Sequence, residues 1–264
     1  MRTIVLTTAA IIALLPTSWA QGDSPSQLRR IKYDAFKPGE EVAYVLHYGP
    51  INAGTAILKV ESTEKQAFGQ SLLRIIGTGQ TNGAFNWFFK VRDRYESYID
   101  AHGVYPWMFY RRVDEGGYKI AQDYVFYQHR NYVNNGAGKK FETPDYAQDM
   151  LSAFYYARTF DMRNAKPGDI LSVTTFIDDE VWTQKIKYVG RENVSIRTGT
   201  YRCLKFVPVV QRGRIFKDEG DLVVYISDDD NKILVLAKAE VLVGSIKMEL
   251  TSAKGLAHPV AKIK

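Results

Sequence analysis

Two ionisable side chains fall on faces that the sequence pattern predicts to be apolar. In the segment VRDRYES (91–97), Asp93 alternates with Tyr95 and is predicted to lie on the inner face of a strand. Arg158 follows Phe154 by one turn on the apolar face of a predicted helix. Because burying a lone carboxylate is costly, we expect Asp93 to have a cationic partner, and Arg158 is the candidate. Such a pair is either structural or, with a second acid about 5 to 9 Å from Asp93, part of a hydrolase site.

Other catalytic and metal-binding patterns are missing from the sequence. The four histidines form no His-x-His or His-Glu-x-x-His pattern, and no Cys/His pair has the spacing of zinc ligands. There is no Gly-x-Ser-x-Gly elbow and no phosphate-binding loop. The acidic run 228–231 lacks the glycine and the later glutamate of an EF-hand loop, so it predicts a hairpin turn. We therefore expect no catalytic residue, no metal site and no cofactor, and we expect that the protein is not an enzyme.

Aromatic residues are abundant, with 17 Tyr, 13 Phe and 4 Trp. A curved sheet can enclose a ligand, so some of these side chains could line a cavity. The candidate ligand-binding residues are Tyr44, Tyr48, Trp87, Phe88, Asp93, Tyr95, Phe154 and Arg158. In one interpretation an acyl chain lies along the aromatic rings, Trp87 and Phe88 form a lid, and Arg158 holds an anionic head group. In the other interpretation the same residues form an ordinary core.

The elements that must position these residues are mostly short strands. Val42, Tyr44, Leu46 and Tyr48 alternate on one face of a strand, and a turn rich in Gly and Pro leads to a second strand. Similar alternating segments follow at short spacing, with turn residues between them. The pattern predicts an all-β fold, a curved antiparallel barrel or half-barrel of about twelve strands.

One helix is predicted at about 144–160 and should pack on the sheet. Thr143 is a candidate N-cap, Pro144 suits the first helical position, and Asp145 and Asp149 favour the N-terminal end. A second, shorter helical turn is predicted at 82–89.

Similar segments recur at a nearly constant offset. KPGEEVAYV at 37 matches KPGDILSVT at 166, an offset of 129, and four further matches have similar offsets in the same order. This suggests two tandem meanders, halves 37–136 and 166–252, although any two antiparallel meanders resemble each other. We expect a single β domain at 34–252, preceded by an N-terminal extension at 21–33 and followed by a flexible tail at 253–264.

The first 20 residues have the features of a signal peptide. Arg2 is followed by an apolar stretch from Ile4 to Leu15, too short to span a bilayer, and small residues precede Ala20. We expect cleavage after Ala20 and export to the periplasm or outer cell envelope of a Gram-negative bacterium. The only cysteine, Cys203, permits no internal disulfide and is expected in the core. No later segment is apolar for 18 residues, so no transmembrane segment is predicted in the mature chain.

The charge distribution gives little support for nucleic-acid binding. The formal net charge is +6, but basic and acidic residues are interleaved and form no basic stripe. We therefore expect no nucleic-acid partner. A lipid or another amphipathic small molecule is the candidate partner, and protein partners cannot be inferred.

Several motifs in order resemble one family. These motifs are FKPGEEVAYVLHYGPINAGTAIL, DRYESYID, DMLSAFYYAR, GTYRCLKFVP and LVVYISDDDNKILVL, and the resemblance covers nearly all of 34–252. The family is domain of unknown function 3108, a group of exported bacterial proteins. The resemblance implies a location in the cell envelope, and it transfers no activity and no site residue.

Three functions remain open at this stage. The first is a non-catalytic envelope protein that binds a hydrophobic or amphipathic ligand or serves envelope maintenance. The second is a hydrolase acting on envelope glycans or lipids, and the third is a protein–protein interaction module that uses a sheet edge.

Overall fold

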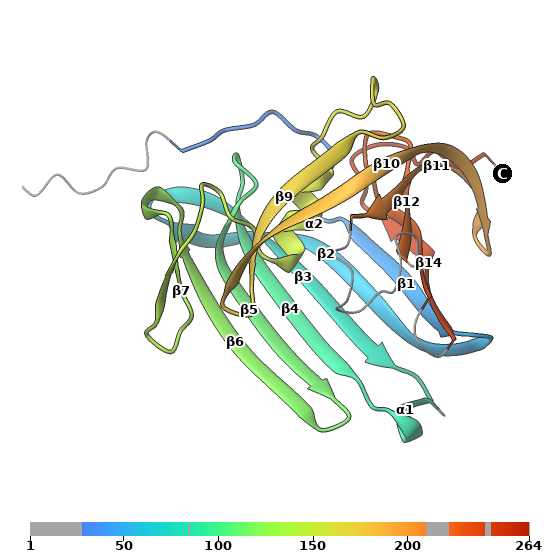
Figure 1. The fold of residues 1–264 in the computed structure, drawn as a ribbon, viewed down its shortest axis with the longest axis horizontal. Helices are drawn as coiled ribbons and strands as arrows, with labels where there is room; N and C mark the ends of the chain where they lie inside the picture. The colour runs from blue at the N-terminus through green and yellow to red at the C-terminus, as the bar shows by residue number, and fades with distance from the viewer. Residues whose placement is uncertain (1–27, 84, 210–221, 241–243, 264) are drawn as a thin grey trace, which may run out of the picture.

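A computed structural model describes residues 28–83, 85–209, 222–240 and 244–263. These residues form one antiparallel sheet of 14 strands that curves around a short helix, as Figure 1 shows. The sheet order is β8-β7-β6-β5-β4-β3-β2-β1-β14-β13-β12-β11-β10-β9. The predicted all-β fold class is therefore confirmed, with two strands more than the predicted twelve.

The first meander contains β1 (Glu41–Tyr48), β2 (Ile51–Ala67), β3 (Gln70–Thr81), α1 (Phe85–Phe88), β4 (Arg92–Asp100), β5 (Pro106–Glu115) and β6 (Tyr118–Tyr127). A connecting segment contains η1 (Gln128–Arg130), β7 (Tyr132–Asn134), β8 (Lys140–Glu142) and α2 (Met150–Ala157). The second meander contains β9 (Ile170–Ile177), β10 (Glu180–Ile196), β11 (Gly199–Pro208), β12 (Leu222–Ser227), β13 (Leu234–Glu240) and β14 (Ser245–Lys254).

The two meanders correspond strand by strand. β1 and β9 both have 8 residues, β2 and β10 both have 17, and each second-meander strand begins about 129 residues after its counterpart. The meanders join where β1 pairs with β14 along its whole length. The arrangement agrees with the offset between similar segments in the sequence.

The second junction expected from this correspondence, between β9 and β6, is absent from the pairings of the described strands. The connecting segment lies there instead. Gln148 bridges to Thr175 of β9, and its backbone carbonyl accepts a hydrogen bond from Phe176 N at 2.8 Å. The Phe176 ring packs against Tyr124 and Phe126 of β6, with ring centroids 5.1 and 6.3 Å away. One short backbone bridge and side-chain packing, rather than a ladder between β6 and β9, thus connect the two meanders on this side.

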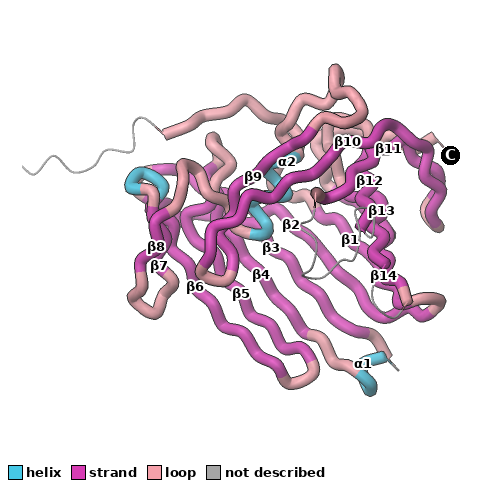
Figure 2. The backbone as a smooth tube through the Cα atoms, in the orientation of Figure 1, coloured by secondary structure: helices cyan, strands magenta, loops and turns pink. Residues whose placement is uncertain are grey.

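The helix α2 lies across the concave face of the sheet, between the two meanders (Figure 2). It begins at Met150, so the predicted start at Pro144 is wrong. The true N-cap is Asp149, whose side chain accepts hydrogen bonds from Leu151 N and Ser152 N, and Ser152 completes a capping box. The preceding residues are drawn into the contact with β9, and Tyr146 has a positive φ of 57°, so the chain there cannot be helical.

The C-terminal segment packs on the sheet. Arg202 N donates to Ala261 O at 2.9 Å and Ile263 N donates to Thr200 O at 2.7 Å, so 253–263 is not the flexible tail that the sequence predicted. The apolar residues Leu256 and Val260 explain this, because both pack on the core. The predicted signal peptide at 1–20 and residues 21–27 of the predicted extension lie outside the described residues. Within the described residues, no helix is long and apolar enough to cross a membrane.

Candidate functional site

An apolar cavity of about 160 Å³ lies between α2 and the concave face of the second meander. Strand pairing explains its floor, because Leu171 pairs with Ile186 and Leu204 pairs with Ile226, which brings their side chains to one face. Its lining residues are Phe154, Ala157, Arg158, Met162, Leu171, Ile186, Leu204, Phe206, Pro208, Val224, Ile226 and Lys232. The cavity is therefore almost entirely apolar, with two cationic side chains on its wall.

A larger polar cleft of about 930 Å³ adjoins the apolar cavity. The two share Met162, Leu204 and Lys232 as lining residues. Four chain segments that are distant in sequence form the cleft, together with β10 and β11: residues 32–34, 159–163, 228–232 and 258–261. The site thus combines an apolar part and a polar part, which is the arrangement that an amphipathic molecule needs.

The polar cleft carries both signs of charge. Its cations are Lys32, Arg163, Arg191, Arg202 and Lys232, and its carboxylates are Asp34, Asp161, Asp228, Asp229 and Asp230. Several of them neutralise each other, since Asp228 accepts from Arg191 at 3.2 Å and from Arg202 at 3.0 Å. The balance favours a zwitterionic or neutral polar group over a highly charged anion.

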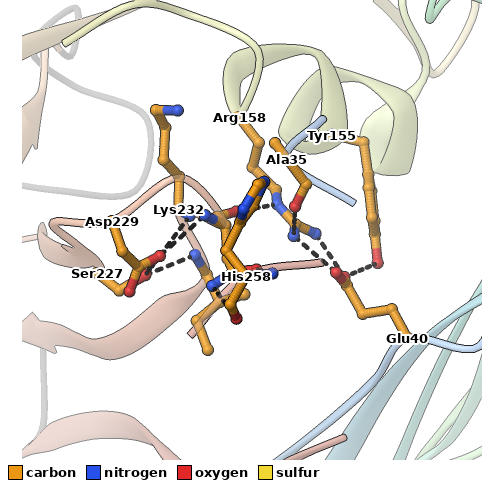
Figure 3. A network of polar contacts seen from close by, with 10 residues as sticks. Ala35, Glu40, Tyr155, Arg158, Ser227, Asp229, Lys232 and His258 are labelled. Carbon is orange, nitrogen blue, oxygen red and sulfur yellow. Dashed lines mark hydrogen bonds and ion pairs between the residues drawn. The ribbon is translucent and has the colours of Figure 1, made fainter. Parts of the chain in front are cut away.

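Lys232 is the cation that borders both the cavity and the cleft. Its backbone N donates to Asp229 Oδ1 at 3.2 Å, and its φ of 49° lies in the left-handed region. Figure 3 shows its side chain extending away from the Arg158–Glu40 ion pair. Because the turn fixes its backbone, Lys232 can present its ammonium group to a ligand that occupies the boundary between the two compartments.

Arg158 is the centre of a buried polar network (Figure 3). Its guanidinium makes a two-point ion pair with Glu40, with N–O distances of 2.6 and 2.8 Å. It also donates to the backbone oxygens of Ala35 and Asn231, each at 2.8 Å. The predicted pairing of Arg158 with Asp93 is therefore wrong, and the head-group role stays a prediction. The guanidinium is engaged by protein groups, and the residue borders the cavity.

The same network fixes the floor of the cleft. Asn231 is fully buried, donates to His258 O at 2.9 Å and accepts from His258 N at 2.8 Å. Asp229 accepts from Ala261 N at 2.7 Å, and His258 contacts Asp34 O at 2.9 Å. Residues 34–40, the end of α2, the β12–β13 turn and the C-terminal segment are thereby tied together. The β12–β13 turn was predicted from the sequence as a hairpin turn, and its buried polar side chains also hold these segments together.

Asp93 lies elsewhere, on the inner face of β4, where it accepts a hydrogen bond from Asp114 N at 3.3 Å. Partial burial and a hydrogen bond to the Asp93 carboxyl raise the pKa of Glu115. The two carboxyls are thus in direct contact, whereas the acid pair of a glycosidase is about 5 to 9 Å apart. This pair lacks the spacing on which the hydrolase alternative depends.

The remaining candidates do not form one pocket. Tyr44 is buried in a core cluster against which Phe154 also packs. Tyr95 packs against Phe109 in another cluster, with ring centroids 6.5 Å apart. Trp87 and Phe88 are 83% and 76% exposed. Tyr48 lies near this exposed segment, with its ring 6.2 Å from that of Phe85. Of the eight predicted residues, Phe154 and Arg158 line the apolar cavity.

Sequence reasoning missed the cations of the cleft and the apolar floor. Lys232 follows an acidic turn that the sequence predicted only as a hairpin turn. Its backbone has a left-handed φ, so it belongs to no helix or strand whose periodicity could mark its position. The floor residues alternate normally along their strands, so they were indistinguishable from core. The side-chain contacts that join four separate segments have no signal in a single sequence.

The comparisons with known proteins agree with this architecture and assign no activity. The profile of the family described as "Protein of unknown function (DUF3108)" matches residues 43–251. No curated protein matches the chain significantly. A crystal structure of a β-barrel-like protein of domain of unknown function DUF1849 from Brucella abortus is similar, with a TM-score of 0.52 and 8% identity. The match covers 81% of this chain and 96% of that one, and it supports the fold alone.

Two further solved structures match over most of their length with lower similarity. One is a candidate exported protein with a YmcC-like fold from Bacteroides fragilis, with 13% identity, coverage of 83% of this chain and 97% of that one, and a TM-score of 0.30. The other is a candidate lipoprotein from Parabacteroides distasonis, with 12% identity, coverage of 83% and 96%, and a TM-score of 0.30.

Proposed function

Because this chain belongs to the DUF3108 family, whose function is not established, we propose a function from its own geometry: it binds a small amphipathic molecule beside α2. The observation that carries this proposal is the junction of an apolar cavity with a polar cleft at Met162, Leu204 and Lys232. The proposed role is binding, and the aliphatic and aromatic lining of the cavity supports it.

The size of the cavity limits the apolar part of the ligand. A cavity of roughly 150 Å³ lined by aliphatic residues holds benzene, and this one has about 160 Å³. We therefore expect a ring or a chain of roughly six carbons inside. A longer acyl chain would extend beyond the cavity along the cleft.

The cleft sets the chemistry of the head group. Its carboxylates and cations are equal in number, so a zwitterion or a neutral polar group fits better than a polyanion. Lys232 stands at the boundary and would contact the first acceptor atoms after the apolar part. An acyl chain with a carboxyl, amide or phosphodiester group near its end has this distribution of polarity.

The place of action is the cell envelope, which we propose from the N-terminal sequence. The signal-peptide features at 1–20 predict export. In the periplasm or outer envelope, amphipathic molecules are plentiful, and a protein with a small apolar cavity could carry or sense one of them. A chain with one cysteine can form no internal disulfide, so an exported protein of this sequence must be stabilised by its core. The Cys203 thiol is buried in that core.

Filling the cavity tests the proposal. Ala157→Phe puts a ring into the cavity from α2, and Ala153→Phe on the same helix, which is not a lining residue, is the matched control. Binding of an environment-sensitive fluorescent acyl probe is measured by titration, with unfolding curves for both variants. We expect at least tenfold weaker binding for Ala157→Phe and little change for Ala153→Phe. Equal binding by both variants would show that the probe uses another site.

A further inference from the structure

Exposed aromatic side chains gather at one end of the sheet. Trp87, Phe88 and Phe89 are 83%, 76% and 47% exposed, and Tyr118 of the adjacent β5–β6 hairpin is 65% exposed. These four residues are called the aromatic tip. Figure 1 shows α1 protruding from the end of the sheet, beyond β3 and β4. Monomeric soluble proteins rarely expose several large aromatic rings side by side, and such apolar patches mark interaction sites.

The backbone holds the aromatic tip in place. Asn86 N and Phe89 N donate to the carbonyls four residues earlier, both at 3.0 Å, and Val91 N donates to Thr81 Oγ1 at 2.9 Å. Gly116 N donates to Lys90 O at 2.8 Å, which fixes α1 against the β5–β6 turn. The rings are thus held on a defined turn. Their contact with water is unfavourable, and binding to an apolar partner surface would remove that contact.

The charges around the aromatic tip select the partner. Lys90 and Arg92 are exposed directly after the aromatic run, and Lys119 is exposed beside Tyr118. Segment 82–92 contains no acidic residue. Three carboxyls lie nearby: Asp114 pairs across the hairpin with Lys119, and the neighbouring Asp93 contributes to a raised pKa of Glu115. Rings flanked by cations are typical of surfaces that insert at the headgroup level of anionic bilayers. We propose that the aromatic tip docks the protein on a lipid bilayer that contains anionic lipids.

The aromatic tip and the ligand cleft lie at opposite ends of β1. The Tyr48 ring, at the end of β1, is 6.2 Å from Phe85 of α1. The cleft residues Asp34 and His258 meet before β1 begins. Eight residues of strand separate these ends by roughly 25 Å. A protein docked through its aromatic tip therefore turns the cleft away from the bilayer, and this inference does not depend on the identity of the cleft ligand.

A fluorophore on the aromatic tip tests the proposal directly. Cys203 is the only cysteine and is fully buried, so a single introduced cysteine can be labelled selectively. Phe88→Cys carries a nitrobenzoxadiazole dye, and Ile170→Cys is the control, because Ile170 is 54% exposed on β9, away from α1 in Figure 1. Each labelled protein is titrated with vesicles of phosphatidylcholine, with and without one quarter phosphatidylglycerol. Circular dichroism checks that both remain folded.

We expect the dye at position 88 to brighten and shift to the blue with phosphatidylglycerol vesicles, and the dye at position 170 to stay unchanged. Adding Trp87→Ser should weaken the response at least tenfold, and Lys90→Gln should weaken it on anionic vesicles alone. No change at position 88, equal changes at both positions, or an unaltered response in Trp87→Ser would overturn the proposal. The proposal would also be overturned if the dye at position 88 brightened without vesicles as the protein concentration was raised, because that result would indicate self-association.

Discussion

Replacing Arg158 with Met should destabilise the protein strongly, because the substitution leaves a buried carboxylate without its cation. The side chains of Arg158 and Glu40 are 2% and 0% exposed, and four hydrogen bonds run from the guanidinium to Glu40, Ala35 and Asn231. After the substitution, Tyr155 Oη at 3.4 Å would be the remaining side-chain donor to Glu40 in the described network. Removing one partner of such a buried pair costs about 3–5 kcal/mol.

Urea unfolding followed by circular dichroism measures this loss. For a chain of this size, about 3–5 kcal/mol corresponds to a fall in Tm of roughly 6–20 °C. The matched control is Arg163→Met, because Arg163 is 84% exposed and pairs with Asp161 at the surface. Its unfolding midpoint should stay close to that of the wild-type protein, because an ion pair at the surface contributes little to stability.

A double variant separates the lost pair from lost packing. In Arg158→Met with Glu40→Gln, the uncompensated charge is gone, so we expect a coupling free energy of about 2 kcal/mol or more between the two sites. A loss below about 1 kcal/mol in Arg158→Met alone, or a coupling near zero, would refute the view that this ion pair fixes the base of the cleft.

Three further predictions concern other buried and exposed groups. Trp87→Ala should change the free energy of unfolding by less than about 0.5 kcal/mol, whereas Trp107→Ala, at 1% exposure, should cost about 3–5 kcal/mol, and thermal melts compare them. Burial raises the pKa of Asp149 to about 6, so the fold binds its proton more tightly than the unfolded chain does. Stability should then rise by roughly 2 kcal/mol as pH falls from about 6 to about 4. This gain should be absent in Asp149→Asn, which keeps the N-cap acceptor, and unfolding curves at several pH values that show the same dependence in both proteins would contradict it. Burial raises the pKa of Cys203 to about 12, so thiol labelling should require unfolding, and rapid labelling of the native protein would count against the buried position.

Much of the architecture could be predicted from the sequence, because apolar and polar residues alternate along each strand and this local pattern is visible in a single sequence. The inner positions of β1, such as Val42 and Tyr44, are buried as the pattern required. The offset of 129 residues between similar segments reflects two meanders of matching strand lengths. The helix was placed correctly, but its start was not. Thr143 and Pro144 are residue types typical of a helix start. Gln148 is held in a bridge to β9, however, so the N-cap is Asp149 and the helix begins at Met150.

The site could not be predicted to the same degree, since it depends on which elements meet. Arg158 was expected to need a buried partner, and it has one, but Glu40 is 118 residues away and nothing in its local pattern marks it as buried. The sequence suggested Trp87 as part of a lid, but Trp87 is 83% exposed and lies in α1, a helix of four residues at the end of the sheet. The cleft unites four segments through polar contacts that have no sequence period.

The most direct test of the central claim is native mass spectrometry of the protein purified gently from its own cells, beside its Ala157→Phe variant. If the cavity beside α2 holds an amphipathic molecule, the wild-type protein should carry an added mass that organic extraction identifies as a small amphiphile, and Ala157→Phe should carry little of it. Equal loading of the two proteins, or a bound molecule without an apolar part, would contradict the account.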